Sequence, residues 1–161
     1  MNKRIILVGP TCSGKSFLRK RFENRGFVCD VSYTSREKRG GEIDGVHYHF
    51  ISSDNFAEMI VENEYFYEWV EYNGNYYGTG LKEWNTLSLF IMETDGIKHI
   101  KPEDRKKCFI IYLDPPQFVR QSRMMKERKW SDETIVERIE TDEKKFYNFS
   151  DYDMIITDPN F

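Results

Sequence analysis

Short, nearly unbroken runs of apolar residues recur along the chain, separated by longer segments of mixed polarity. The runs are Ile5–Val8, Phe27–Val31, Leu87–Met92, Phe109–Leu113 and Met154–Ile156. Apolar runs of this length, without alternating polar positions, are typical of strands buried on both faces of a parallel sheet. The pattern therefore predicts an α/β fold with a doubly wound, five-stranded parallel sheet.

Several segments between these runs have the spacing and the end signals of helices. They are Ser16–Asn24, a helix capped by Ser53 or Asp54, residues 94–101, a helix from Pro116 to about Arg128, and a helix capped by Ser131. In the last of these, Ile135 and Ile139 lie one helical turn apart and are predicted to face the core.

A different pattern fills residues 32–79. A polar, glycine-rich loop leads to a helix, and two aromatic segments, Glu64–Tyr72 and Asn75–Thr79, flank the pair Asn73-Gly74. An Asn-Gly pair in this position is typical of a β-hairpin turn. We therefore predict a small α+β insertion between two strands of the main sheet.

The segment after the first apolar run carries the clearest chemical signal. It consists of Gly9, Pro10, Thr11, Cys12, Ser13, Gly14, Lys15 and Ser16, and it fits the phosphate-binding pattern G-x-x-x-x-G-K-[ST]. A strand before this loop and a helix after it are the context that it needs, because backbone N–H groups and the helix N-terminus bind phosphate together. We predict that Lys15 contacts the β- and γ-phosphates of ATP and that the Ser16 hydroxyl ligates Mg²⁺.

The composition narrows the class of protein. The 161 residues suit one domain, and the net charge of −3 argues against a general nucleic-acid surface. The chain has no apolar run of about 18 residues and no signal-peptide pattern, so we expect no membrane association. Three cysteines lack metal-ligand spacing and are interpreted as reduced thiols of a cytoplasmic protein: Cys12, Cys29 and Cys108.

Further motifs follow the phosphate-binding loop in order. They read Ser32-x-Thr-Ser-Arg36-x-x-Arg39-x-Gly-Glu-x-x-Gly45-x-x-Tyr48-x-Phe, then Glu68-Trp69, then Gly74-Asn75-x-Tyr77-Gly78-Thr79. With these motifs, nearly the whole chain resembles the guanylate kinases. The resemblance implies that the GMP phosphate is held by Arg36, Arg39, Tyr48 and Tyr77. It also implies that guanine is read by Ser32, Glu68, Thr79 and Glu93.

These implied roles agree with the chemistry of the residues. Paired arginines and tyrosine hydroxyls offset the repulsion between the GMP phosphate and the γ-phosphate of ATP. A carboxylate such as Glu68 accepts the N1–H and 2-amino protons of guanine, and the Thr79 hydroxyl can donate to O6. Adenine would set a bare N1 lone pair against that carboxylate, and a site of this kind rejects the wrong base by about 10⁴-fold.

The resemblance also implies a division of the chain and the substrates. A single P-loop NTPase-type domain would have a core (residues 1–31, 80–122 and 139–161), a GMP-binding insertion (32–79) and a helical lid (123–138). In the lid, Arg128 and Arg138 are the candidates for stabilising the transferring phosphoryl group, with Arg123 a weaker third. Substrates would be ATP, with Mg²⁺, and GMP or dGMP, and the protein would be a monomer or a homodimer.

The chain departs from the family pattern at several positions. The family usually has Asp-x-Asp where this chain has Ile91-Met92-Glu93, and it has a lid glycine where this chain has Lys129. Thr157 replaces a common asparagine near adenine. The chain ends at Phe161, before the usual C-terminal helix, so we expect exposed apolar surface or a partner subunit there; such a short form would suit a viral enzyme.

The leading prediction is transfer of the ATP γ-phosphoryl group to GMP or dGMP. Two alternatives remain open on the sequence. Glu93 and the altered lid are compatible with a broader deoxynucleoside monophosphate kinase. The lost carboxylate at Ile91 is compatible with a non-catalytic module that binds phosphorylated peptides, although such a module has little use for Gly14, Lys15 and Ser16.

Overall fold

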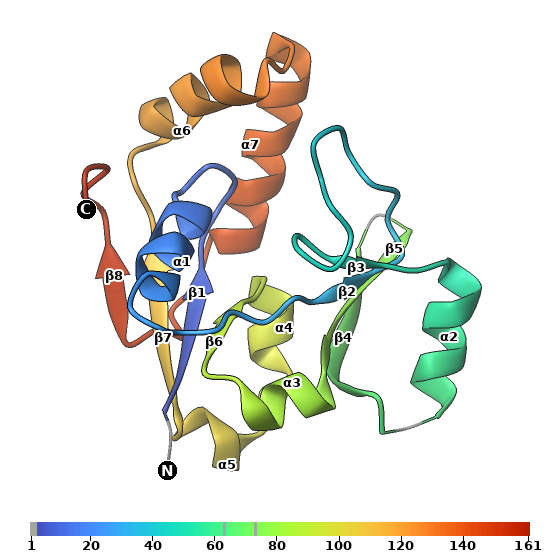
Figure 1. Ribbon diagram of the computed structural model, residues 1–161. Helices are drawn as coiled ribbons and strands as arrows, with labels where there is room; N and C mark the ends of the chain where they lie inside the picture. Colours follow the sequence, from blue (N-terminus) through green and yellow to red (C-terminus); the bar gives the residue numbers. More distant parts are fainter. Residues whose placement is uncertain (1–2, 63, 73) are drawn as a thin grey trace.

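The computed structural model describes residues 3–62, 64–72 and 74–161 (Figure 1). The strands are β1 (Arg4–Val8), β2 (Tyr33–Thr34), β3 (His49–Phe50), β4 (Phe66–Tyr72), β5 (Asn75–Gly80), β6 (Leu89–Ile91), β7 (Cys108–Leu113) and β8 (Met154–Ile156). The helices are α1 (Lys15–Glu23), α2 (Ser53–Val61), α3 (Leu81–Thr86), α4 (Thr94–Lys98), α5 (Pro102–Arg105), α6 (Gln117–Arg123), the π-helix η1 (Met124–Arg128) and α7 (Asp132–Phe146).

The main sheet has the strand order β6-β1-β7-β8, and all its pairs are parallel. This confirms the predicted doubly wound α/β class. The strand predicted at Phe27–Val31 is reduced to a single parallel bridge between Cys29 and Leu89, beside β6. The short β6 offers few pairing positions at this edge, and the chain leaves the main sheet after Asp30, whose N–H still bonds Leu89 O at 2.8 Å.

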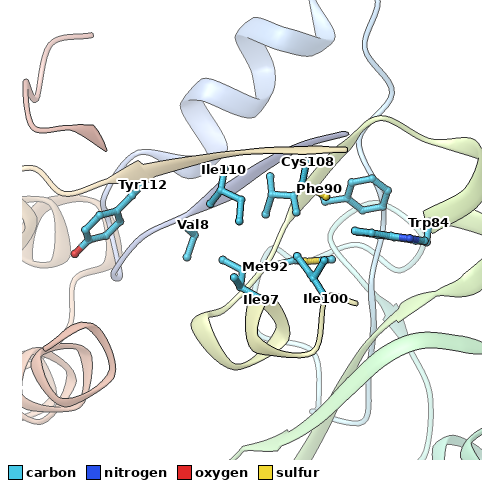
Figure 2. Packing of buried hydrophobic residues seen from close by; sticks show 10 residues of the cluster. Val8, Trp84, Phe90, Met92, Ile97, Ile100, Cys108, Ile110 and Tyr112 are labelled. Atoms are coloured by element: carbon cyan, nitrogen blue, oxygen red, sulfur yellow. The ribbon is translucent and has the colours of Figure 1, made fainter. Parts of the chain in front are cut away.

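Alternate residues of the main-sheet strands pack on opposite faces, as strand geometry requires. On one face Val8 joins a cluster closed by Trp84 of α3 and by the segment that contains α4; Figure 2 shows this packing. On the other face Leu7 packs in a cluster that includes Leu18 of α1. Helices on both faces therefore bury the strands, which explains their continuous apolar sequence.

A second four-stranded sheet lies beside the main sheet and has the order β3-β2-β5-β4 (Figure 1). Strands β4 and β5 form the antiparallel pair that the aromatic segments predict. The predicted turn begins at Asn73, which lies outside the described residues. Helix α2 packs its buried Phe56 against Phe66 and Tyr76 of this sheet, with ring centroids 4.5 and 5.3 Å apart.

The helix boundaries differ from the predicted ones in identifiable ways. The cap of α2 is Ser52 rather than Ser53 or Asp54, because the extended Ser52 accepts the Asn55 N–H through its hydroxyl. The helix predicted as continuous to Arg128 changes into the π-helix η1 and ends at Lys129, which has a left-handed backbone with φ of 54°. Glycine adopts that conformation most readily, which agrees with the glycine that the resemblance implies at this position.

Helix α7 agrees with the prediction, whereas α3 and α5 were not predicted. Ser131 caps α7 by accepting the Thr134 N–H, and Ile135 and Ile139 are buried. The short helices α3 and α5 carry no pattern long enough to predict. Among the described residues, no helix has both the length and the apolar character needed to cross a membrane.

Candidate functional site

The loop between β1 and α1 has the geometry of a phosphate cradle. Gly14 has φ of 105°, a conformation that favours glycine, and a side chain at Gly9 would clash with the carbonyl of Leu113 at the end of β7. Helix α1 begins at Lys15, so the N–H groups of its first turn have no partner within the helix and are available to an anion.

Lys15 is enclosed by this loop. Its Nζ donates to the carbonyl oxygens of Gly9 and, at 3.0 Å, of Pro10. Burial lowers the pKa of Lys15, while the negative charges of Glu93 and Asp142 oppose that shift. The ammonium group therefore lies where the loop would hold phosphate oxygens.

Glu93 lies between cations from two parts of the chain. Its carboxylate accepts from Lys145 Nζ of α7 at 3.0 Å, and Lys145 also lies over the ring of Tyr72, 4.0 Å from its centroid. Burial alone would raise the pKa of Glu93, but the charges of Lys15 and Lys145 lower it below the ordinary value. The carboxylate is thus held in its ionised form.

The three arginines predicted near the lid all contact the phosphate-binding loop, but differently. Arg138 Nε donates to Thr11 Oγ1 at 2.5 Å. Arg123 donates to the carbonyl oxygens of Cys12 and Pro159, each at 3.0 Å, which ties the loop to the end of the chain. Arg128 is exposed near the Cys12 thiol; burial raises the pKa of that thiol, and the Arg128 charge lowers it in part.

The residues predicted to hold the GMP phosphate lie in the second sheet and its loop. The Arg36 guanidinium makes two 2.9 Å hydrogen bonds to the Glu42 carboxylate and lies 5.5 Å from the centroid of the Tyr48 ring. Tyr48 and Tyr77 are neighbours, with ring centroids 6.2 Å apart. Burial raises the pKa of Tyr48 to about 12, so its hydroxyl stays a donor at neutral pH.

Among the described residues, the hydrogen bonds of Arg39 are made by its backbone. Its N–H donates to Glu42 at 2.8 Å, while its side chain is exposed. The structure thus brings Arg36, Tyr48 and Tyr77 together and leaves Arg39 at the rim.

Of the residues predicted to read guanine, Thr79 and Glu68 pair with each other, Ser32 pairs with Asp30, which was not predicted, and Glu93 pairs with Lys145 instead. Thr79 donates to Glu68 at 2.7 Å, and Ser32 donates to Asp30 at 2.7 Å. Burial raises the pKa of Glu68 to about 7 and that of Asp30 to about 6. The Thr79 proton that was expected to face guanine O6 is therefore engaged by Glu68 in this structure.

Glu68 is closely enclosed by the neighbouring helix. A side chain added at Gly96 of α4 would place its Cβ only 3.1 Å from Glu68 Oε2. The close fit at Gly96 holds the Glu68 carboxylate between β4 and α4.

Four charged residues at the site were not predicted from the sequence: Asp30, Glu42, Asp142 and Lys145. Glu42 belongs to the arginine-containing loop motif, so its place in that motif was a usable signal. The other three reach the site through the fold alone, and no local spacing marks them.

The protein groups that could bind Mg²⁺ are few. Within the part of the chain that the structure describes, no group of three or more His, Cys, Asp or Glu side chains could hold a metal. Ser16 is exposed on the first turn of α1, and Glu93 lies near Lys15. One hydroxyl beside a phosphate cradle fits Mg²⁺, which is usually bound by one or two protein ligands together with substrate phosphates.

Comparison with known proteins agrees with this geometry. The sequence profile of the family described as guanylate kinase matches residues 1–161. A guanylate kinase from Carboxydothermus hydrogenoformans is 35% identical over 94% of this chain and 78% of its own length. One from Aster yellows witches'-broom phytoplasma is 35% identical over 97% of this chain and 80% of its own.

A solved structure supports the fold. The crystal structure of guanylate kinase from Anaplasma phagocytophilum superposes with a TM-score of 0.74 at 22% identity, covering 99% of this chain and 79% of that one. Together with the match across the full sequence, these findings show that the chain belongs to the guanylate kinase family.

Proposed function

We propose that this protein transfers the γ-phosphoryl group of ATP to GMP or dGMP, giving ADP and GDP or dGDP. The proposal is supported by two residue clusters that are suited to bind anions and are built differently. A backbone cradle with Lys15 lies at the end of β1, and Arg36 and Tyr48 of the loop between β2 and β3 lie near Tyr77 of β5. Two phosphorylated substrates need such a pair of sites.

Each site has a separate role in the reaction. The loop and Lys15 would hold the ATP phosphates, and Arg36, Arg39, Tyr48 and Tyr77 would hold the phosphate of GMP. That phosphate has a second pKa near 6 and is mostly dianionic at neutral pH, so it needs no general base. Arg128 and Arg138 would stabilise the charge on the transferring group.

Mg²⁺ would be held by the ATP phosphates and the Ser16 hydroxyl, and when bound it neutralises phosphate charge. Ser32, Glu68, Thr79 and Glu93 would select guanine, with the hydroxyl protons of the two pairs rearranging when the base arrives. The division into core, insertion (32–79) and lid (123–138) would let both nucleotides be enclosed and water excluded. We expect a cytoplasmic enzyme that acts on free nucleotides.

Replacement of Lys15 tests the loop assignment. Lys15→Ala should lower the rate of ATP-dependent GDP formation by at least about 10³-fold, because the cation that contacts the β- and γ-phosphates is lost. Lys20→Ala, an exposed lysine on the same helix, is the matched control and should retain activity. Near-full activity of Lys15→Ala would show that the loop does not serve catalysis.

A panel of acceptors tests the base assignment. With GMP, dGMP, AMP, CMP and dTMP under one condition, we expect GMP and dGMP to react and AMP to be slower by about 10⁴-fold. Similar rates for all five would favour a broader monophosphate kinase. Absence of any GDP formation from a folded protein would favour a binding module, which the intact loop and the lid arginines argue against.

A further inference from the structure

Asp142 is a buried carboxylate in the middle of α7 that contacts the phosphate-binding loop. Its side chain is only 4% exposed. Asp142 Oδ2 accepts the backbone N–H of Thr11 at 2.8 Å, and Oδ1 accepts the Thr11 hydroxyl at 3.2 Å. In Figure 1 this part of the loop lies beside α7.

The same contacts include a candidate catalytic arginine. Arg138 Nε donates to the Thr11 hydroxyl, and it lies 3.7 Å from Asp142 Oδ1, one turn earlier on α7. Thr11 is therefore held on both sides: its hydroxyl accepts from Arg138 and donates to Asp142. The Arg138 side chain is 33% exposed, so its guanidinium is open to a phosphoryl group.

Arg120 of α6 supplies the opposite charge. Its Nη1 lies 3.4 Å from Asp142 Oδ2, its side chain is 7% exposed, and its buried Nε has no partner within the described residues. A buried charge that loses its partner is strongly destabilising, whereas removal of both partners together is often tolerated. The Asp142–Arg120 pair thus connects α6 and α7 to the start of the loop.

We infer that Asp142 is a positioning residue for phosphoryl transfer, with Arg120 as its buried counterion. Asp142 holds the phosphate-binding loop in place through Thr11, and it holds Arg138 in a fixed position relative to that loop. The loop and the Arg138 guanidinium, which contacts the γ-phosphoryl group, therefore keep the same relative position. Asp142 touches neither substrate in this role. The inference rests on the proposed function.

Three variants separate positioning from simple stabilisation. Asp142→Ala removes the acceptor of the Thr11 N–H and leaves Arg120 unpaired in the interior. Arg120→Met/Asp142→Ala removes both charges, so the melting temperature should recover relative to the single variant. Glu143→Ala, an exposed neighbour on the same helix, is the control.

Both variants that lack Asp142 should lower kcat by about 10²-fold, the usual cost of a small misplacement, with the KM for GMP within about twofold. Glu143→Ala should leave kcat, KM and melting temperature unchanged. If the double variant recovers kcat together with its melting temperature, Asp142 is only structural. A rise in the KM for GMP as large as the fall in kcat would also overturn the inference.

The outcome can be distinguished from a failure of the proposed function. If the wild-type protein makes no GDP, the proposed function is wrong, and calorimetric titration with MgATP still tests the loop. Binding about tenfold weaker in the double variant than in wild type would support positioning by Asp142. Equal affinities would overturn it.

Discussion

Glu68 is a carboxyl group enclosed between β4, β5 and α4, with Thr79 donating to one oxygen and Gly96 packed near the other. Such enclosure disfavours the ionised form, and burial raises the pKa of Glu68 to about 7, with the charge of Asp30 adding to the shift. Guanine presents two N–H donors, which would replace the water that burial removes from the carboxylate. Bound guanine would therefore favour the ionised form of Glu68. The residue therefore couples base binding to its own ionisation.

The pH dependence of GMP binding follows from this coupling. Because guanine needs the ionised carboxylate, the dissociation constant of GMP should rise as the pH falls below about 7, approaching tenfold per pH unit. Calorimetric titration between pH 6 and 8 measures this trend. Glu68→Gln should bind GMP weakly with a flatter profile, and an equally steep profile in that variant would assign the titration elsewhere.

The raised pKa of Glu68 also makes the free energy of unfolding depend on pH. The folded protein retains the Glu68 proton that the unfolded chain releases near its ordinary pKa of 4.5. This contribution to the free energy of unfolding is therefore fully present below pH 4.5 and is lost as the pH rises to about 7.

At the scale of elements, α7 carries several functions on one side. Its buried residues Ile135 and Ile139 anchor it to the fold, while Arg138, Asp142 and Lys145 follow at spacings of four and three residues. Side chains at these spacings share a helix face. One rigid helix thus contacts both the phosphate-binding loop, through Thr11, and the predicted base site, through Glu93.

The N-terminus of α7 is a test of this element. Ser131 accepts the Thr134 N–H through its hydroxyl at 3.3 Å, and Asp132 and Glu133 occupy the first turn. Ser131→Ala should lower the free energy of unfolding by about 1 kcal/mol, because a capping side chain is lost. Chemical denaturation measures the change, and Ser131→Asp should retain most of the stability because aspartate also caps. Equal loss in both variants would contradict a capping role.

At the scale of the whole molecule, the two anion sites belong to different sheets. The cradle ends β1 of the main sheet, whereas Arg36 follows β2 of the second sheet. Repulsion between the GMP phosphate and the ATP triphosphate is overcome only if both sites approach and exclude water. We therefore expect the second sheet and the lid segment to close when both substrates are bound.

Small-angle X-ray scattering can measure this closure. The radius of gyration should fall toward about 15 Å, the value for a compact chain of this length, when GMP and a non-hydrolysable ATP analogue are both added. Either ligand alone should give a smaller change. An unchanged radius with both ligands would mean that the sites already have their reactive separation.

The regular part of the fold could be predicted because its signals are local. Continuous apolar runs mark strands buried on two faces, and these runs correspond to β1, β6, β7 and β8. The run around Cys29 is apolar except for Asp30, and it forms only a single bridge, between Cys29 and Leu89. Whether an apolar run forms a full edge strand depends on the length of the strand it pairs with, here β6. The sequence of the run itself does not give that length.

The site residues that belong to sequence motifs could be predicted, because these signals are local as well. Motif residues are adjacent in sequence, but the partners that orient them are distant. Asp142 and Thr11 are 131 positions apart, and Lys145 and Glu93 are 52 positions apart. The direction of a hydroxyl proton, as in Thr79, depends on the carboxylate that folding brings beside it.

The contacts of Lys15 have a consequence for how ATP is captured. Its ammonium group already has two oxygen ligands from its own chain, the carbonyls of Gly9 and Pro10. The ammonium group has three N–H donors, so one remains for a phosphate oxygen, and any further phosphate contact must replace one of these carbonyl bonds. The net contribution of Lys15 to ATP affinity is therefore the gain from its phosphate contacts minus the loss of its contacts to the loop carbonyls.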